Sequence, residues 1–169
     1  MVETLAMQAN RSIEFVTGQL AYAERATIPE TDPVFGDSSM DYRSCSGAVG
    51  RVLLWSPTQS IGVQLEQGEL DDGIDNNGNG LIDEGRLVFT QDLGLAAEQQ
   101  TTKGHWIREY LEGEVPNGID DNGNGLIDER GLTFQTDGST VNVQLTLEAL
   151  DPSGRLITKT VRSTIRIRN

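Results

Sequence analysis

The chain has little of the chemistry on which most enzymes depend. It contains one histidine and one cysteine among 169 residues, and aromatic residues make up only 5%. A single cysteine, Cys45, excludes an intramolecular disulfide, and the sequence around His105 contains no Cys-His or Ser-His arrangement. Zinc is disfavoured, because it prefers nitrogen and sulfur ligands. We therefore expect a protein that is not an enzyme and has no catalytic residues.

Long apolar runs and basic clusters are also missing. No stretch approaches the 18 or more apolar residues of a membrane helix, and no signal peptide with its apolar segment is present. The net charge is −13, which argues against nucleic acid, because phosphate binding requires clustered Lys and Arg. Nine of the negative charges lie in two short segments, 71–84 and 120–129. Removing them leaves about −4, which is ordinary for a domain of this size.

What the chain does contain is a thirteen-residue motif that occurs twice, 45 residues apart. Residues 72–84 and 117–129 are identical at eleven positions, and both differences exchange Asp with Asn. In the first copy, Asp75, Asn77 and Asn79 offer oxygens at alternate positions, and a glycine follows where the backbone must turn. This is the first half of the EF-hand rule for a calcium loop.

The second half of the motif departs from that rule. An EF-hand has its bidentate Glu at the twelfth position, which holds Arg86 in the first copy, and the acidic pair Asp83-Glu84 comes earlier. Strand-like sequences follow the motif instead of a helix, and Ile82 is expected to anchor the loop in the protein. We predict a shortened, helix-free relative of the EF-hand loop. It resembles the Asp-Gly-x-Asp-Asn repeats of many secreted bacterial proteins, which implies metal binding.

This interpretation predicts two Ca²⁺ sites, one per repeat, as cofactors. Simple Asn-Gly hairpin turns are the competing interpretation, and the near-identical duplication favours the metal. Magnesium is disfavoured because it keeps several waters and seldom needs so many protein oxygens. It is left open which member of each closing Asp-Glu pair coordinates. The expected ligands are Asp72, Asp75, Asn77, Asn79, the Leu81 carbonyl, Asp83 and Glu84 in the first site, and Asn117, Asp120, Asn122, Asn124, the Leu126 carbonyl, Asp128 and Glu129 in the second.

Periodicity predicts one helix followed by strands. Apolar residues recur at steps of three and four near the N-terminus, which predicts a helix over 1–26 and an irregular connection over 27–48. The fold class is therefore α+β: an N-terminal helix packed on an antiparallel β-sheet meander, with two calcium-binding loop insertions. Residues 1–169 form a single domain, in which 49–169 supply the sheet and 71–85 and 116–130 are the metal loops. The helix stripe is Leu5, Ala9, Ile13, Val16, Leu20 and Ala23, and the expected strands are 49–55, 60–66, 86–91, 104–111, 132–136, 140–150 and the C-terminal residues after the turn at 151–154.

Four segments beside the helix carry a family resemblance: Arg86-Leu-Val-Phe-Thr90, Tyr110-Leu-Glu-Gly-Glu-Val115, Gly131-Leu-Thr-Phe134 and Thr164-Ile-Arg-Ile-Arg-Asn169. With the helix, they resemble type IV pilins and the pseudopilins of type II secretion, most closely the minor pseudopilin J or PilW-like group. The similarity covers the helix and roughly residues 86–169, with the metal loops as insertions. It implies a pilin-like domain with a structural role, whose partners are other pilin or pseudopilin subunits.

The resemblance also implies an extracytoplasmic location: anchored in the inner membrane before assembly, and periplasmic or on the cell surface afterwards. The membrane would be reached only through an apolar N-terminal helix segment that is absent from this chain. The alternative function is a secreted or cell-surface calcium-dependent adhesin or binding module. The coding sequence upstream of Met1 distinguishes the two, because a pilin helix continues upstream into an apolar span.

Overall fold

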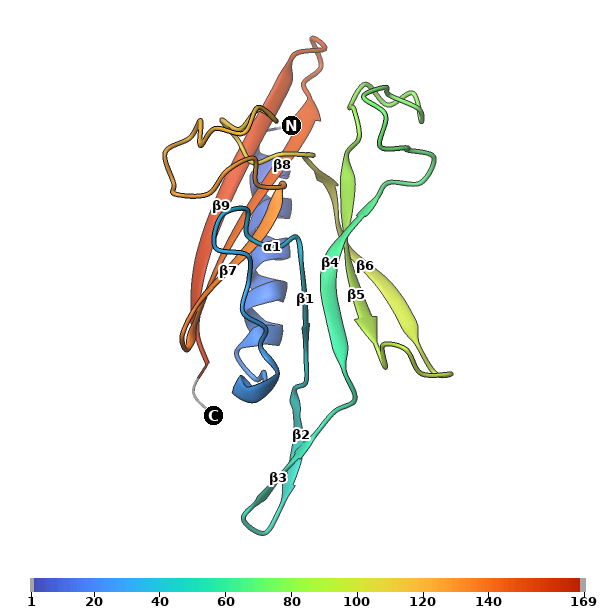
Figure 1. Cartoon of the computed structure of the whole chain (residues 1–169). Helices are drawn as coiled ribbons and strands as arrows, with labels where there is room; N and C mark the ends of the chain where they lie inside the picture. The colour runs from blue at the N-terminus through green and yellow to red at the C-terminus, as the bar shows by residue number, and fades with distance from the viewer. Residues whose placement is uncertain (1, 168–169) are drawn as a thin grey trace.

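The computed structural model describes residues 2–167 and is built mainly of strands (Figure 1). Strands account for 42% of the chain and helix for 13%, so the fold is mostly β. The elements are α1 (Val2–Leu20), the 3₁₀ turn η1 (Arg25–Thr27), β1 (Ser39–Tyr42), β2 (Cys45–Val49), β3 (Val52–Trp55), β4 (Gln59–Leu65), β5 (Gly85–Gln91), β6 (Gln99–Ile107), β7 (Leu132–Asp137), β8 (Thr140–Leu150) and β9 (Leu156–Arg166).

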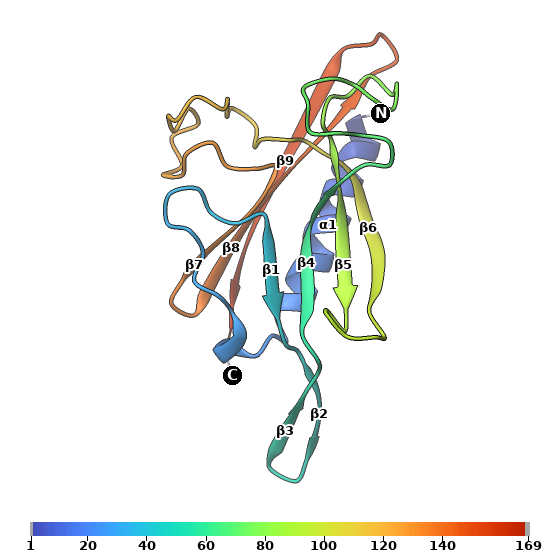
Figure 2. The same cartoon turned by 45° about the vertical axis from the view of Figure 1, so that its right-hand side comes forward.

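Seven of the strands form one antiparallel sheet. Its order is β1-β4-β5-β6-β8-β7, and β9 pairs with the other edge of β8 along eleven residue pairs. The sheet is not a meander, because the neighbour of β6 is β8, paired through Ile107 and Leu147, and not β7, the next strand in the sequence. Strands β2 and β3 form a separate two-stranded hairpin. Figure 2 shows this hairpin extending beyond the body of the sheet.

The first and last strands of this order, β1 and β7, lie close together and nearly close the sheet into a barrel. Asp37, two residues before β1, exchanges two backbone hydrogen bonds with Phe134 of β7, at 3.0 and 2.7 Å. The expectation of an α+β helix-on-meander fold is therefore wrong. Closure pairs backbone N–H and C=O groups at strand edges that an open sheet would leave exposed. It depends on residues almost a hundred positions apart, which local periodicity does not report.

The predicted stripe of α1 is confirmed as part of the core. All six of its residues are buried, although Ala23 lies beyond the end of α1. The helix packs against β9, β8 and β6. Phe15 on the next face of the helix meets Phe89 of β5 edge to face, with ring centroids 5.5 Å apart. The helix ends at Leu20, earlier than the sequence suggested. No helix among residues 2–167 is both long and apolar enough to cross a membrane.

The strand expectations were correct where a long alternation was present. The β7–β8 hairpin lies where it was expected, and the alternating residues Val141, Val143, Leu145, Leu147 and Ala149 are all buried. The region 27–48 is not only irregular, because it contains β1 and most of β2. The expected strand 49–55 is interrupted by the turn between β2 and β3. The expected strand 104–111 is β6, which begins and ends earlier. Arg168 and Asn169, which end the last quoted segment, lie outside the described residues.

Candidate metal centres

The two repeats form equivalent loops at the same end of the molecule (Figure 1). Loop 1 (residues 66–84) joins β4 to β5, and loop 2 (residues 111–129) leads from β6 to β7. Each loop is closed at its base by the same backbone hydrogen bond, from the N–H of its first residue to the carbonyl of its last. The distance is 3.0 Å in both cases, Glu66 to Glu84 and Leu111 to Glu129. The repeated sequence therefore folds into a repeated structure.

An aspartate near the middle of each loop holds the tight turn together. The carboxylate of Asp75 accepts backbone N–H groups from Gly78, Asn79 and Gly80 at 2.6, 3.2 and 2.7 Å. Asp120 does the same in loop 2, at 2.6, 3.1 and 2.9 Å. Three donors on one carboxylate make the aspartate oxygens a fixed, negatively charged point inside the turn.

The closing Asp of each loop has a structural task. Asp83 and Asp128 have φ values of 51° and 49°, in the left-handed region that few non-glycine residues adopt. Each carboxylate accepts two backbone N–H groups from the start of its own loop, with Gly73 at 2.7 Å and Gly118 at 2.8 Å as the shorter bonds. These contacts tie the two ends of the motif together.

The closing Glu of each loop is the most unusual group in the structure. Glu84 is 0% exposed and Glu129 is 1% exposed. Oε1 of Glu84 accepts the side-chain amides of Asn77 and Asn79 at 2.9 and 2.6 Å. Oε1 of Glu129 likewise accepts the amides of its two equivalents, Asn122 and Asn124.

The other oxygen of each closing Glu has no hydrogen-bond partner within residues 2–167. Oε2 of Glu84 and Oε2 of Glu129 are both buried and unpartnered. A buried polar atom without a partner costs about 1–3 kcal/mol, and more when the group is charged. Both copies therefore offer a cation the same thing: a carboxylate oxygen, unpartnered among the described residues, beside two Asn side chains. The oxygen atoms that could bind a metal here belong to carboxylate and amide groups, and neither loop contains His or Cys. This set of oxygen ligands suits Ca²⁺.

Two further acidic residues belong to the loops, and the sequence analysis missed them. Glu69 accepts the N–H of Asn77 at 2.7 Å, and its equivalent Glu114 accepts the N–H of Asn122 at 2.8 Å. Both are buried, at 6% and 2% exposed. The signal was available, since Gly-Glu followed by an aliphatic residue precedes both motifs at the same 45-residue spacing.

The remaining predicted ligands lie at the edges of the loops. Leu81 and Leu126 put their side chains into the protein interior, at 5% and 0% exposed, whereas Ile82 is 51% exposed. The leucine therefore anchors the loop, and the prediction for Ile82 was wrong. Asp72 and Asn117 are exposed, and each accepts a backbone N–H two residues further on, at 3.1 and 2.8 Å.

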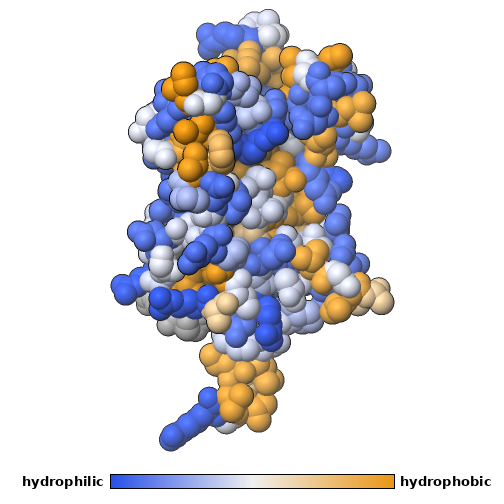
Figure 3. Space-filling view, viewed as in Figure 1, coloured by the Kyte–Doolittle hydropathy of each residue, from blue (hydrophilic) through white to orange (hydrophobic). Residues whose placement is uncertain are grey.

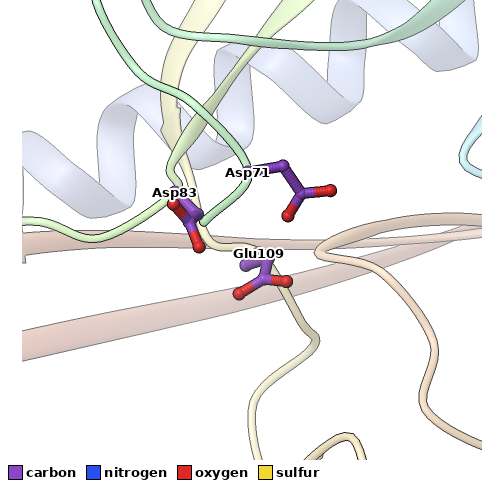
Figure 4. A group of neighbouring side chains, drawn as sticks. All are labelled: Asp71, Asp83 and Glu109. Atoms are coloured by element: carbon purple, nitrogen blue, oxygen red, sulfur yellow. The ribbon is translucent and has the colours of Figure 1, made fainter. Parts of the chain in front are cut away.

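A third acidic group lies between the two loops. Carboxylate oxygens of Asp71, Asp83 and Glu109 come within 4.8 Å of one another, and Figure 4 shows the three side chains together. Arg130, immediately after loop 2, lies 2.8 Å from Glu109 and 3.9 Å from Asp71, and its guanidinium stacks on Tyr110. This group borders a cavity of about 230 Å³. Arg130 already supplies positive charge here and links the two loops.

An ion pair near the loops joins a half-buried arginine to a buried glutamate. Nε of Arg108 is 3.3 Å from Oε2 of Glu148, whose side chain is 6% exposed. Burial raises the pKa of Glu148 to about 7; Arg108 opposes this shift, while Glu84 and Glu109 add to it. His105 is half-exposed and pairs with Glu66 through a 2.6 Å contact.

Comparison with protein-family models, with curated proteins and with solved structures found no match to this chain. The pilin resemblance therefore rests only on residues of this chain.

Proposed function

We propose that the chain is a calcium-stabilised, non-catalytic structural subunit of a pilus or of a type II secretion pseudopilus. One observation carries the calcium part of this proposal. A buried glutamate oxygen without a partner occurs at the same place in both loops, at Glu84 and at Glu129. A divalent cation supplies the missing interaction and relieves the burial of negative charge.

The loop chemistry favours a stabilising cation over a catalytic one. Loops 1 and 2 contain 13 of the 26 acidic residues of the chain and no basic residue, so their carboxylates repel one another without a metal. The expected ligands include two amides in the first motif and three in the second, which lowers the ligand charge. That composition is typical of the weaker sites of extracellular modules, with Kd of about 10⁻⁴–10⁻³ M. Such sites are filled only where calcium is abundant, which supports a location outside the cytoplasm.

The assembly part of the proposal rests on α1 and on the pilin resemblance. The buried stripe of α1 fixes the helix to the body, so an upstream continuation would project as a stalk. The test is the coding sequence upstream of Met1. We expect it to continue the helix into an apolar span of about 20 residues. An upstream globular domain in place of that span would contradict membership in a pilus.

A second candidate is a secreted or cell-surface calcium-dependent binding module. The cavity between the loops favours it, because its lining offers both carboxylates and the guanidinium groups of Arg108 and Arg130 to a ligand. In this case the loops would shape a recognition surface. The upstream apolar span would then be absent.

Titration calorimetry after chelator treatment tests calcium binding directly. We expect two Ca²⁺ per chain and much weaker heats with Mg²⁺. Glu84→Gln and Glu129→Gln should each remove one equivalent. Asp121→Asn is the matched control, because it also removes one acid, gives the residue that the first repeat has at that position, and lies outside the expected ligand sets. The absence of binding at millimolar calcium would refute the central claim.

A further inference from the structure

The hairpin β2–β3 is a projection with several large apolar side chains exposed. It forms its own two-stranded sheet, and Figure 3 shows hydrophobic residues over most of this projection, which has a hydrophilic tip, at the lower end of the molecule. Two-stranded hairpins alone are marginally stable in water, and large apolar side chains exposed together mark interaction surfaces. The exposed residues are Val49 (67%), Val52 (65%), Leu53 (45%) and Leu54 (45%).

The root of the hairpin is held firmly, so its direction is set by the fold. Cys45 donates its N–H to the carbonyl of Tyr22 at 3.0 Å, and Ser56 donates its N–H to the carbonyl of Ser44 at 2.8 Å. The bridge between Ala23 and Ser44 adds a further tie to the end of α1. The projection is therefore a fixed arm of the body.

Charge distinguishes this arm from the rest of the chain. The hairpin, residues 45–55, contains one arginine and no acidic residue, whereas the remainder of the chain contains 12 basic and 26 acidic residues. Arg51 lies at the turn between β2 and β3. An arm that is apolar and weakly basic fits a surface that is apolar and acidic.

The opposite end of the same molecule is such a surface. We define the loop end as the surface formed by loops 1 and 2, which lie away from the hairpin in both views (Figures 1 and 2). The loop end carries half of the acidic residues of the chain. It also exposes aliphatic side chains at matched positions of the two repeats: Leu70 (60%) with Val115 (56%), and Ile74 (62%) with Ile119 (60%).

We propose that the hairpin of one copy docks on the loop end of a second copy, head to tail. The two patches are different surfaces of the chain, so the contact is heterologous and repeats along a line. Leu53 and Leu54 pack on the exposed aliphatic residues of the loops, and Arg51 faces their carboxylates. This inference deepens the proposed filament role and rests on it in one respect: calcium must order the loops for docking.

Cysteine cross-linking tests the geometry of the contact. In a Cys45→Ser background, one variant carries Leu53→Cys in the hairpin and another carries Ile74→Cys in loop 1. With a short bifunctional maleimide and calcium present, we expect cross-linked dimers mainly when the two variants are mixed. Dimers formed as readily by the Leu53→Cys variant alone would show a symmetric hairpin contact and overturn the proposal. A lack of cross-links at all concentrations up to the solubility limit would also overturn it.

Sedimentation equilibrium measures the strength of the contact. The mass of the wild type should rise above the 18.4 kDa monomer with increasing concentration. Arg51→Glu and the pair Leu53→Ser, Leu54→Ser should each weaken association about tenfold or more, as central interface residues do. Leu95→Ser, at another exposed leucine (54%), is the control and should leave association unchanged. Equal weakening by the control would overturn the proposal.

The remaining measurements separate this inference from the calcium proposal. The hairpin variants should still bind two Ca²⁺ by calorimetry, because they lie far from the loops. Wild type that binds calcium but stays monomeric refutes the docking and leaves the metal sites intact. Flotation with lipid vesicles that requires Leu53 and Leu54, without self-association, would assign the hairpin to a membrane surface and refute docking between copies.

Discussion

Calcium should raise the thermal stability of the protein by an amount that depends on two side chains. The perturbation is Glu84→Gln, Glu129→Gln and the double variant, which remove the buried charge of each loop with little change of shape. Melting is followed by calorimetry in chelator, in calcium and in equal magnesium. Since each glutamate closes its own loop, we expect each substitution to cancel the contribution of one site only.

The magnitude follows from linkage. A ligand that binds only the folded state at a hundredfold excess over Kd adds about 2.7 kcal/mol. Two independent sites therefore add about 5 kcal/mol. For a chain of this length, 1 kcal/mol shifts Tm by about 2–4 °C. Wild type should gain about 10–20 °C in calcium, each single variant about half of that, and the double variant almost nothing.

The controls and the refuting results are specific. The control Asp121→Asn should keep the full calcium shift. A double variant that gains as much in calcium as the wild type would show that Glu84 and Glu129 do not hold the metal. An equal shift in magnesium would exclude the calcium selectivity on which the function depends.

Three further predictions concern the loops and the core. In chelator, limited proteolysis should cut first within 71–85 or 116–130, where the backbone loses its organising cation; first cuts elsewhere in the sheet would contradict this. Leu126→Ala should cost about 2–5 kcal/mol in chemical denaturation, while Ile82→Ala, at an exposed position, should cost less than about 0.5 kcal/mol. Because its folded pKa of about 7 lies above the ordinary 4.5, Glu148 contributes stability that is present below pH 4.5 and lost as pH rises through 7, by at most about 3 kcal/mol. Glu148→Gln should flatten that part of the pH profile in denaturant titrations, and an unchanged profile would refute the assignment.

The sequence predicted the parts of the fold that depend on local order. The eleven-residue alternation of β8 and the stripe of α1 each extend long enough to define a buried face. Strand β1 has only four residues and was not recognised, because two buried positions do not establish a period. Closure of the sheet joins distant segments through the backbone bonds of Asp37 with Phe134 and through the hydroxyl contact of Thr31 with Thr136. Local periodicity does not encode either contact.

The two repeated loops were predicted in outline and corrected in detail, and metal binding stays a prediction. The duplicated motif identified the residues that cluster around Glu84 and Glu129. The analogy with the EF-hand then placed the anchor one residue too late, at Ile82 instead of Leu81. It also directed attention downstream to the missing twelfth position, so the upstream Glu69 and Glu114 were overlooked. Comparing the two repeats beyond their most similar part would have recovered both.

The carboxylates that hold the loop turns also bear on how the protein ages. The chain contains five Asn-Gly sequences, all within the two loops, and asparagine followed by glycine is prone to deamidation. That reaction begins when the glycine nitrogen attacks the asparagine side-chain carbonyl. In every case the glycine N–H is bonded to an aspartate: Gly78 and Gly80 to Asp75, Gly123 and Gly125 to Asp120, and Gly118 to Asp128.

While the loop is intact, its hydrogen bond to an aspartate therefore holds each glycine nitrogen away from the asparagine side-chain carbonyl. Loss of the loop structure exposes all five sequences at once, and each deamidation adds another negative charge to a segment already crowded with them. A chain whose loops have been disordered for a long time would therefore carry deamidated asparagines. Mass spectrometry would detect each deamidation as a mass increase of about one dalton.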